Sequence, residues 1–89
     1  MRAVRVVVRG RVQGVGYRWH VREAARRMAV TGWVRNCDDG SVELLVAGDP
    51  RAVDAVLEAV RSGPPAARVE DVEVVPAGDS VLPPTFSVR

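Results

Sequence analysis

The sequence has no lysine, and it has only one cysteine, one histidine and four aromatic residues. Without lysine there is neither a Schiff-base amine nor a lysine clamp for phosphate, so any cationic anchor for a ligand must be an arginine. The single cysteine, Cys37, excludes an intramolecular disulfide, and packing alone must hold the fold together. One histidine with one cysteine cannot make a typical zinc site. We expect neither a metal site nor a cofactor.

Long hydrophobic runs are also missing from the chain. The apolar stretch at residues 1–9 is too short and too often interrupted by arginine to be a signal peptide. Nothing approaches the length of a transmembrane helix. The 13 arginines are offset by 11 acidic residues, and a net charge of +2 does not favour nucleic acid as a partner. We therefore expect a cytoplasmic protein that binds neither membrane nor nucleic acid.

The length and composition fit one globular domain spanning residues 1–89. Hydrophobic residues make up 47% of the chain and charged residues 27%, which is an ordinary balance for a folded protein. A domain of this size buries roughly 60–65% of the surface that its unfolded chain exposes, so it can fold alone. We expect a monomer.

Two segments have the period of an amphipathic helix. The first is expected over about residues 18–30, ending before Gly32, and its apolar stripe at i, i+3, i+4 and i+7 consists of Val21, Ala24, Ala25 and Met28. The second begins after Asp49, which can cap free N–H groups, and Pro50 suits its first position. Gly63 ends it, and its stripe consists of Val53, Val56, Leu57 and Val60.

Valine-rich or alternating segments predict strands at 3–9, 33–37, 42–46, 68–75 and 85–88. Asp39-Gly40 predicts a hairpin between the second and third strands, and a turn is expected at 76–84. The order strand, helix, strand, strand, helix, strand, with a short terminal strand, predicts an α+β fold. We expect the ferredoxin-like split βαβ arrangement (βαββαβ), an antiparallel sheet with two helices on one face.

The junction of the first strand and the first helix carries the most chemical information. Three glycines in seven residues, Gly10, Gly14 and Gly16, let successive N–H groups point inward and form a nest for an anion. The helix that follows adds free N–H groups and the positive end of its dipole. Arg18 offers a rigid, permanently charged fork to phosphate oxygens. On composition alone, a simple tight turn remains an equal alternative.

The chain resembles the acylphosphatase family at two separated motifs. The family's first signature, G-x-V-Q-G-V-x-[FY]-R, is matched by GRVQGVGYR at residues 10–18. The second, G-W-V-x-N followed by D-G-x-V-E, is matched by GWVRN at 32–36 and DGSVE at 39–43. Two motifs in the right order are far more specific than either alone, and the resemblance covers essentially the whole chain.

This resemblance implies an enzyme that hydrolyses small-molecule acyl phosphates to carboxylate and inorganic phosphate. It implies that Arg18 binds the phosphate and that Asn36 positions the attacking water. It further implies that backbone N–H groups complete the phosphate cradle, from Val12, Gln13, Gly14, Val15, Gly16 and Tyr17. The alternative left open is a non-catalytic phosphate-binding or accessory module of the same fold.

Several other side chains are given structural roles. His20 lies about 200° around the helix from Arg18, which does not favour a general acid there. Cys37 should point to the opposite face of the strand from Asn36. Trp33 is expected to pack, Tyr17 to brace the loop, and the helical arginines to form a solvated face (Arg22, Arg26, Arg27). An RNA-binding role is disfavoured because the aromatic RNP motif is missing.

Overall fold

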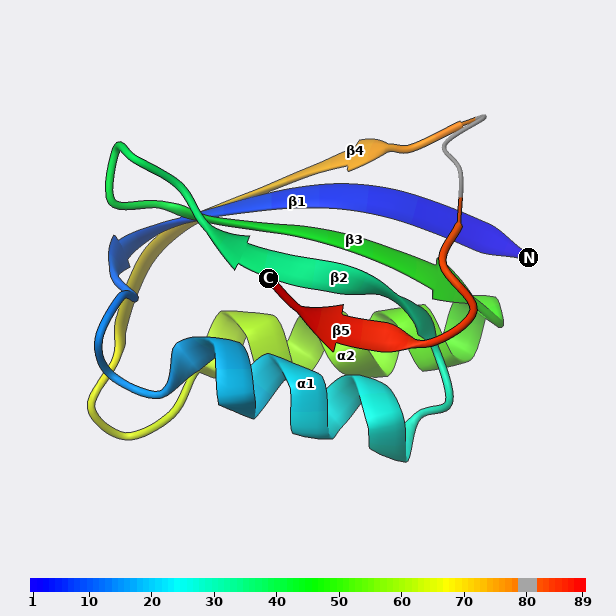
Figure 1. Ribbon diagram of the computed structural model, residues 1–89, viewed down its shortest axis with the longest axis horizontal. Coiled ribbons are helices and arrows are strands. Elements are labelled where there is room, and N and C mark those ends of the chain that lie inside the picture. The colour runs from blue at the N-terminus through cyan, green and yellow to red at the C-terminus, as the bar shows by residue number, and fades with distance from the viewer. Residues whose placement is uncertain (79–81) are drawn as a thin grey trace.

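The computed structural model describes residues 1–78 and 82–89. The elements in chain order are β1 (Arg2–Arg11), α1 (Tyr17–Arg27), β2 (Thr31–Asn36), β3 (Val42–Gly48), α2 (Pro50–Ser62), β4 (Arg68–Pro76) and β5 (Phe86–Val88). The strands form one sheet in the order β4-β1-β3-β2-β5, and both helices cover the same face of it (Figure 1). The predicted ferredoxin-like fold is confirmed.

The sheet is mixed because of its last strand. β1 pairs antiparallel with both β3 and β4, with Val6 opposite Leu44 on one side and Val74 on the other. β2 also pairs antiparallel with β3, whereas β5 joins β2 in parallel, with Gly32 opposite Phe86. The expected antiparallel arrangement therefore holds for β1 to β4 and not for β5. This edge strand lies beside β2 and above α1 (Figure 1).

The core lies between the sheet and the two helices. Alternate residues of β1 are fully buried, as the period of two requires when one face is covered. The core face of the sheet and the two helical stripes contribute Val4, Val6, Val8, Leu44, Val21, Ala25, Val53, Val56, Leu57 and Val60. Each buried valine or leucine contributes roughly 1.5–3 kcal/mol relative to exposure. Of the predicted stripe on α1, Ala24 and Met28 are only partly buried.

The start of α2 agrees with its sequence signals, whereas α1 is shorter than expected. Asp49 Oδ1 accepts a hydrogen bond from the Arg51 N–H at 2.9 Å, and Pro50 follows the cap. α1 starts at Tyr17 and ends at Arg27, three residues before the predicted end. Ala29 has a left-handed φ of 57°, which turns the chain out of the helix. Gly32 lies inside β2.

The hairpin between β2 and β3 forms as predicted around Asp39-Gly40. Asp39 Oδ1 accepts hydrogen bonds from the N–H of Ser41 at 3.0 Å and from its hydroxyl at 2.6 Å. Since β2 ends at Asn36, Cys37 belongs to this turn and not to the strand. Of the turn expected at 76–84, residues 79–81 lie outside the described residues. Within the described ranges, neither helix is long and apolar enough to cross a bilayer.

Candidate active site

A cavity of about 400 Å³ opens where β1 passes into α1. The connecting loop contributes Val12, Gly14 and Gly16 to its lining, and α1 contributes Tyr17, Arg18, Trp19 and Arg22. Asn36, from the end of β2, and Val88, from β5, complete it. Arg18 and Asn36, which the sequence analysis selected from separate motifs, thus line the same cavity. It holds two cations and no carboxylate among its lining residues.

The loop exposes its backbone to this cavity. Gly14 and Gly16 have left-handed φ angles of 73° and 79°, which a residue with a side chain rarely adopts. A Cβ at either position would meet nothing within 4 Å, so the space above the loop is open. Both flanks are buried, since Val12 and Tyr17 are each 1% exposed. The Tyr17 hydroxyl donates to the Val60 carbonyl at 2.7 Å, so this side chain ties the start of α1, where the loop ends, to α2.

The first turn of α1 adds positive potential to the cavity. Its N-cap is Gly16, and no side chain caps the helix or places a carboxylate in the first turn. The first backbone N–H to bond within the helix is that of His20, to the Gly16 carbonyl at 3.0 Å. The N–H groups of Tyr17, Arg18 and Trp19 precede it and lack an intrahelical acceptor. Such a terminus favours a bound anion.

Arg18 is half-buried and tied to the far end of the chain. Its Nη1 donates a hydrogen bond to the backbone oxygen of Arg89 at 2.8 Å. A guanidinium carries five N–H donors, so this bond orients the group while other donors remain for a ligand. The contact joins α1 to the residue after β5, and so the edge strand helps to position the cation.

Asn36 carries an unsatisfied buried acceptor. Its Oδ1 is the one buried side-chain oxygen or nitrogen without a hydrogen-bond partner in the described part of the chain. Buried polar atoms in folded proteins nearly always have a partner, and each exception calls for an explanation. This acceptor belongs to a residue that lines the cavity.

Gln13 has a role that the sequence did not reveal. Its side-chain amide Nε2 donates to the carbonyls of Cys37 at 2.8 Å and Ser41 at 2.9 Å. It therefore ties the glycine-bearing loop to the turn that follows Asn36. Val15 packs partly against the core, and neither of these side chains lines the cavity. Gln13 and Val15 can therefore contribute to an anion cradle only through their backbone N–H groups.

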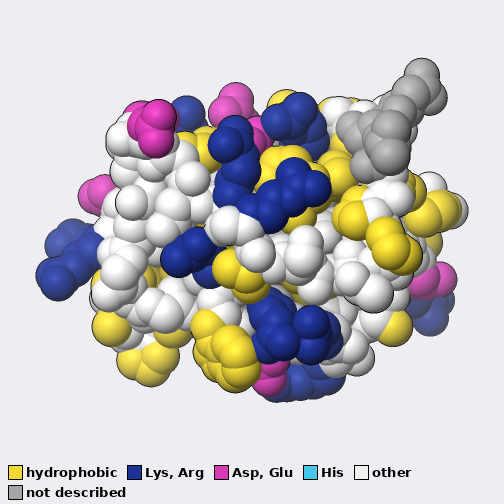
Figure 2. Space-filling view, in the orientation of Figure 1, with side chains coloured by type: hydrophobic (Ala, Val, Ile, Leu, Met, Phe, Trp, Pro, Cys, Tyr) yellow, Lys and Arg dark blue, Asp and Glu magenta, His cyan; other side chains and the backbone are white. Residues whose placement is uncertain are grey.

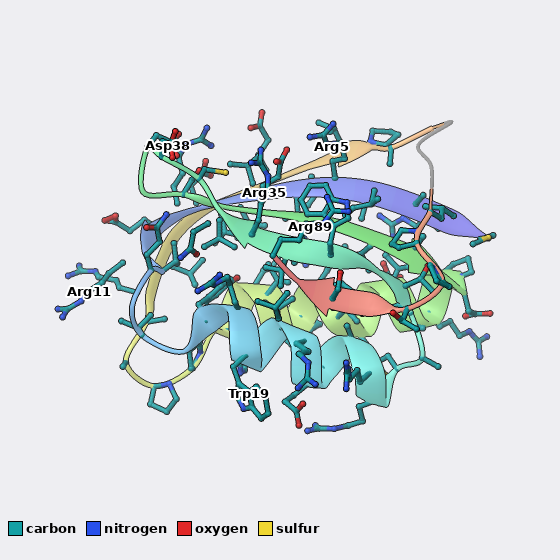
Figure 3. All side chains as sticks on the ribbon, in the orientation of Figure 1. Arg5, Arg11, Trp19, Arg35, Asp38 and Arg89 are labelled. Carbon is teal, nitrogen blue, oxygen red and sulfur yellow. The ribbon has the colours of Figure 1, made fainter. Side chains whose placement is uncertain are left out.

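The remaining candidates lie away from the cavity. His20 Nε2 is 2.9 Å from the Ala59 carbonyl, so it links α1 to α2. Cys37 is half-buried in the hairpin turn. Arg11 belongs to the first motif but extends away from the molecule (Figure 3). Among the residues that the structure describes, no group of three or more histidine, cysteine or acidic side chains is arranged to hold a metal ion.

Trp19, Arg22 and Val88 line the cavity although none was expected there. The Arg22 guanidinium lies 4.9 Å from the centre of the Trp19 ring, so it is not simply part of a solvated face. One signal was available, because Arg22 follows Arg18 by four residues and must share its side of the helix. For Val88 there was no local signal, since its place depends on the parallel pairing of β5 with β2.

Comparison with known proteins gives a consistent result. A family model described as Acylphosphatase matches residues 4–87. An acylphosphatase from Rhizobium etli is 49% identical over 86 residues, covering 97% of this chain and 92% of that relative. One from Thermococcus kodakarensis is 51% identical over 76 residues, covering 83% and 84%. The crystal structure of acylphosphatase from Bacillus subtilis superposes with a TM-score of 0.95 at 39% identity, covering 100% and 99%.

Proposed function

Since the chain belongs to the acylphosphatase family and hydrolyses acyl phosphates, we propose that the cavity at the β1–α1 junction is its active site. One observation carries this proposal. Arg18, at the start of α1, and Asn36, at the end of β2, line the same cavity, beside a loop whose backbone faces open space. The cavity therefore combines a phosphate anchor with a polar group that can hold a water.

The phosphate is held by charge and by backbone donors. The N–H groups of residues 12–17 and the first turn of α1 surround the phosphoryl oxygens, and Arg18 supplies a fork of two parallel donors. Arg22 adds a second positive charge in the same cavity. With two arginines and no carboxylate side chain among its lining residues, the cavity favours a doubly negative ligand.

Asn36 holds the water that attacks phosphorus. Its unpaired Oδ1 accepts a hydrogen bond from that water and so fixes the direction of attack. The water oxygen bonds to phosphorus while the bond from phosphorus to the acyl oxygen breaks, and its electron pair leaves with the carboxylate. The proton of the water passes to a phosphoryl oxygen. The products are one carboxylate and one dihydrogen phosphate, which account for every atom and charge of the water and the acyl phosphate dianion.

This reaction needs no strong base or acid from the protein. A carboxylate is a weak base that leaves without being protonated. The transition state of phosphoryl transfer is loose, with its charge spread over the phosphoryl oxygens. Positioning and charge stabilisation can therefore supply most of the rate acceleration. One arginine, one amide and a loop suffice, and His20 and Cys37 need take no part.

A direct assay tests this proposal. Benzoyl phosphate is offered to the purified protein with a chelator present, and its loss is followed in the ultraviolet. We expect rapid hydrolysis that inorganic phosphate inhibits competitively, and slow hydrolysis of p-nitrophenyl phosphate because its leaving group is poorer. If inorganic phosphate did not inhibit, or if inhibition persisted unchanged in Arg18→Ala, the phosphate would have to bind elsewhere.

The wider setting is also proposed here. Residues 1–89 act as one domain, as a monomer, in the cytoplasm, without a metal or other cofactor and without a nucleic-acid partner. One sheet that includes both β1 and β5 supports the single domain, and the near-balanced charge disfavours nucleic acid. Light scattering behind a sizing column tests the monomer, and activity after dialysis against chelator tests metal independence.

A further inference from the structure

Two exposed hydrophobic side chains line the cavity at the β1–α1 junction. In the described ranges the large exposed hydrophobic residues are Met1, Trp19, Val75 and Val88. Two of the four, Trp19 at 61% and Val88 at 41% exposed, line the cavity that contains Arg18 and Asn36. A single exposed hydrophobic side chain is ordinary, but two from separate elements at the mouth of one polar cavity form an apolar wall.

Arg22 holds the tryptophan ring in place. Its guanidinium lies 4.9 Å from the ring centre, within the range of a cation–π contact. Arg22 also pairs with Glu23 at 3.3 Å, so its own position is supported. Trp19 projects from the outer side of α1 (Figure 3). Hydrophobic and arginine side chains lie next to each other over this helix (Figure 2). The ring therefore offers an exposed apolar surface beside Arg22.

The cavity has more room than a phosphate needs. A phosphoryl group fills only a small part of about 400 Å³, a volume within the range of sites for small organic ligands. Arg18, Asn36 and the loop account for its polar part. Trp19 and Val88 are the exposed hydrophobic side chains of the lining. An in-line displacement places the leaving group opposite the attacking water, so the acyl group needs a surface of its own.

We propose that Trp19 and Val88 bind the acyl group and give the enzyme a preference for apolar, ring-bearing acyl phosphates over acetyl phosphate. This inference rests on the proposed phosphate site at Arg18. A planar apolar acyl group can lie on the Trp19 ring and remove both surfaces from water, whereas an acetyl group is too small to cover it. Trp19 thus sets specificity and takes no part in bond breaking.

Binding of non-hydrolysable analogues tests the wall separately from turnover. Benzoylphosphonate and acetylphosphonate are titrated into the wild type by calorimetry, and we expect the benzoyl compound to bind about tenfold tighter from its extra buried apolar surface. Trp19→Ala should reduce this ratio to within about twofold, because it should weaken the benzoyl compound much more than acetylphosphonate. Trp19→Phe should retain most of the ratio, since a ring remains.

The other tryptophan provides a matched control. Trp33 also lies near an arginine, with the Arg89 guanidinium 4.8 Å from its ring centre, but it does not line the cavity. Trp33→Ala should leave the ratio of the two affinities as in the wild type. A similar preference is expected in kcat/KM for benzoyl over acetyl phosphate, and Trp19→Ala should lower kcat/KM for the benzoyl substrate more than for the acetyl substrate.

Two results would overturn the inference. One is a wild type that binds both phosphonates equally, and the other is an equal loss of both affinities in Trp19→Ala. Arg18→Ala separates the failure of the phosphate site from the failure of the wall. It should weaken both ligands by the same factor, and unchanged affinities in that variant would reject Arg18 as the anchor. The ratio of the two phosphonate affinities in Trp19→Ala would still test whether the apolar wall binds the acyl group.

Discussion

The side-chain amide of Gln13 donates a hydrogen bond to the backbone carbonyl of Cys37 at 2.8 Å, next to Asn36. A second bond from the same nitrogen reaches the Ser41 carbonyl at 2.9 Å. These contacts tie the glycine-bearing loop to the β2–β3 turn. In the proposed mechanism, the distance between the phosphate and the water on Asn36 therefore depends on Gln13.

Gln13→Ala should lower both stability and turnover. Each lost hydrogen bond costs about 0.5–1.5 kcal/mol, so we expect the free energy of unfolding to fall by roughly 1–3 kcal/mol. We also expect kcat to fall more than the affinity for phosphate, because the loop survives while its distance to Asn36 loosens. Urea unfolding and steady-state kinetics measure the two effects. A less stable variant with unchanged kcat would restrict Gln13 to a structural role.

Asn36→Ala should separate turnover from phosphate binding. Without the amide, the water loses its orienting partner, and we expect kcat to fall by about 10²–10³, as when one key transition-state donor is removed. Affinity for inorganic phosphate should change by less than about twofold, since Arg18 and the loop remain. Asn36→Asp is a useful companion of the same shape. Its negative charge should also weaken phosphate binding, and unaltered turnover in Asn36→Ala would identify another residue as the one that positions the water.

Acid should weaken the fold through Glu43, which lies between Arg5 and Arg35. The Glu43 side chain is 11% exposed and bonds Arg35 at 2.6 Å and also Arg5. Burial alone would raise its pKa, but the hydrogen bonds and charges of the two arginines outweigh burial and lower the pKa below the ordinary 4.5. A lowered folded-state pKa gives stability that is fully present above the ordinary, unfolded-state pKa and is lost as pH falls through the lowered pKa.

Thermal melts between pH 7 and pH 2 test this ion cluster. We expect the melting temperature to decrease as the pH drops below about 4.5. Glu43→Gln should melt lower at pH 7, by about 4–8 °C if roughly 1 kcal/mol is lost, and should fall less with acid. The pKa of Asp39 is also lowered, because hydrogen bonds from Ser41 stabilise its charged form, so Asp39 also loses stabilising interactions in acid. In Glu43→Gln the melting temperature should therefore still fall with acid, but less steeply than in the wild type. An equally steep fall in both proteins would contradict the assignment to Glu43.

The sequence was sufficient for most of the fold because its local signals agree with one another. Alternating valines in β1, the apolar stripes of α1 and α2, the Asp39-Gly40 turn and the Asp49 cap each specify a local structure that the sheet can use. The direction of β5 could not be predicted from three residues. Whether a short edge strand runs parallel or antiparallel depends on where the preceding connection crosses the sheet.

The predicted site was incomplete for a similar reason. Arg18 and Asn36 came from motifs within the chain, and the structure places both at one cavity. Val88 and the double hydrogen bond of Gln13 depend on contacts between elements far apart in sequence, which local patterns cannot reveal. Arg22 is the exception, since its spacing from Arg18 already placed it on the same side of α1.

The most direct test of the account compares Arg18→Lys and Arg18→Ala with the wild type, using kcat/KM for benzoyl phosphate and the inhibition constant for inorganic phosphate. A lysine keeps the charge but cannot reproduce the fork, so both variants should lose at least about 10²–10³ in kcat/KM and bind phosphate more weakly. Circular dichroism confirms that each variant is folded. Turnover within a few fold of the wild type in either variant would contradict the claim that Arg18 holds the phosphate.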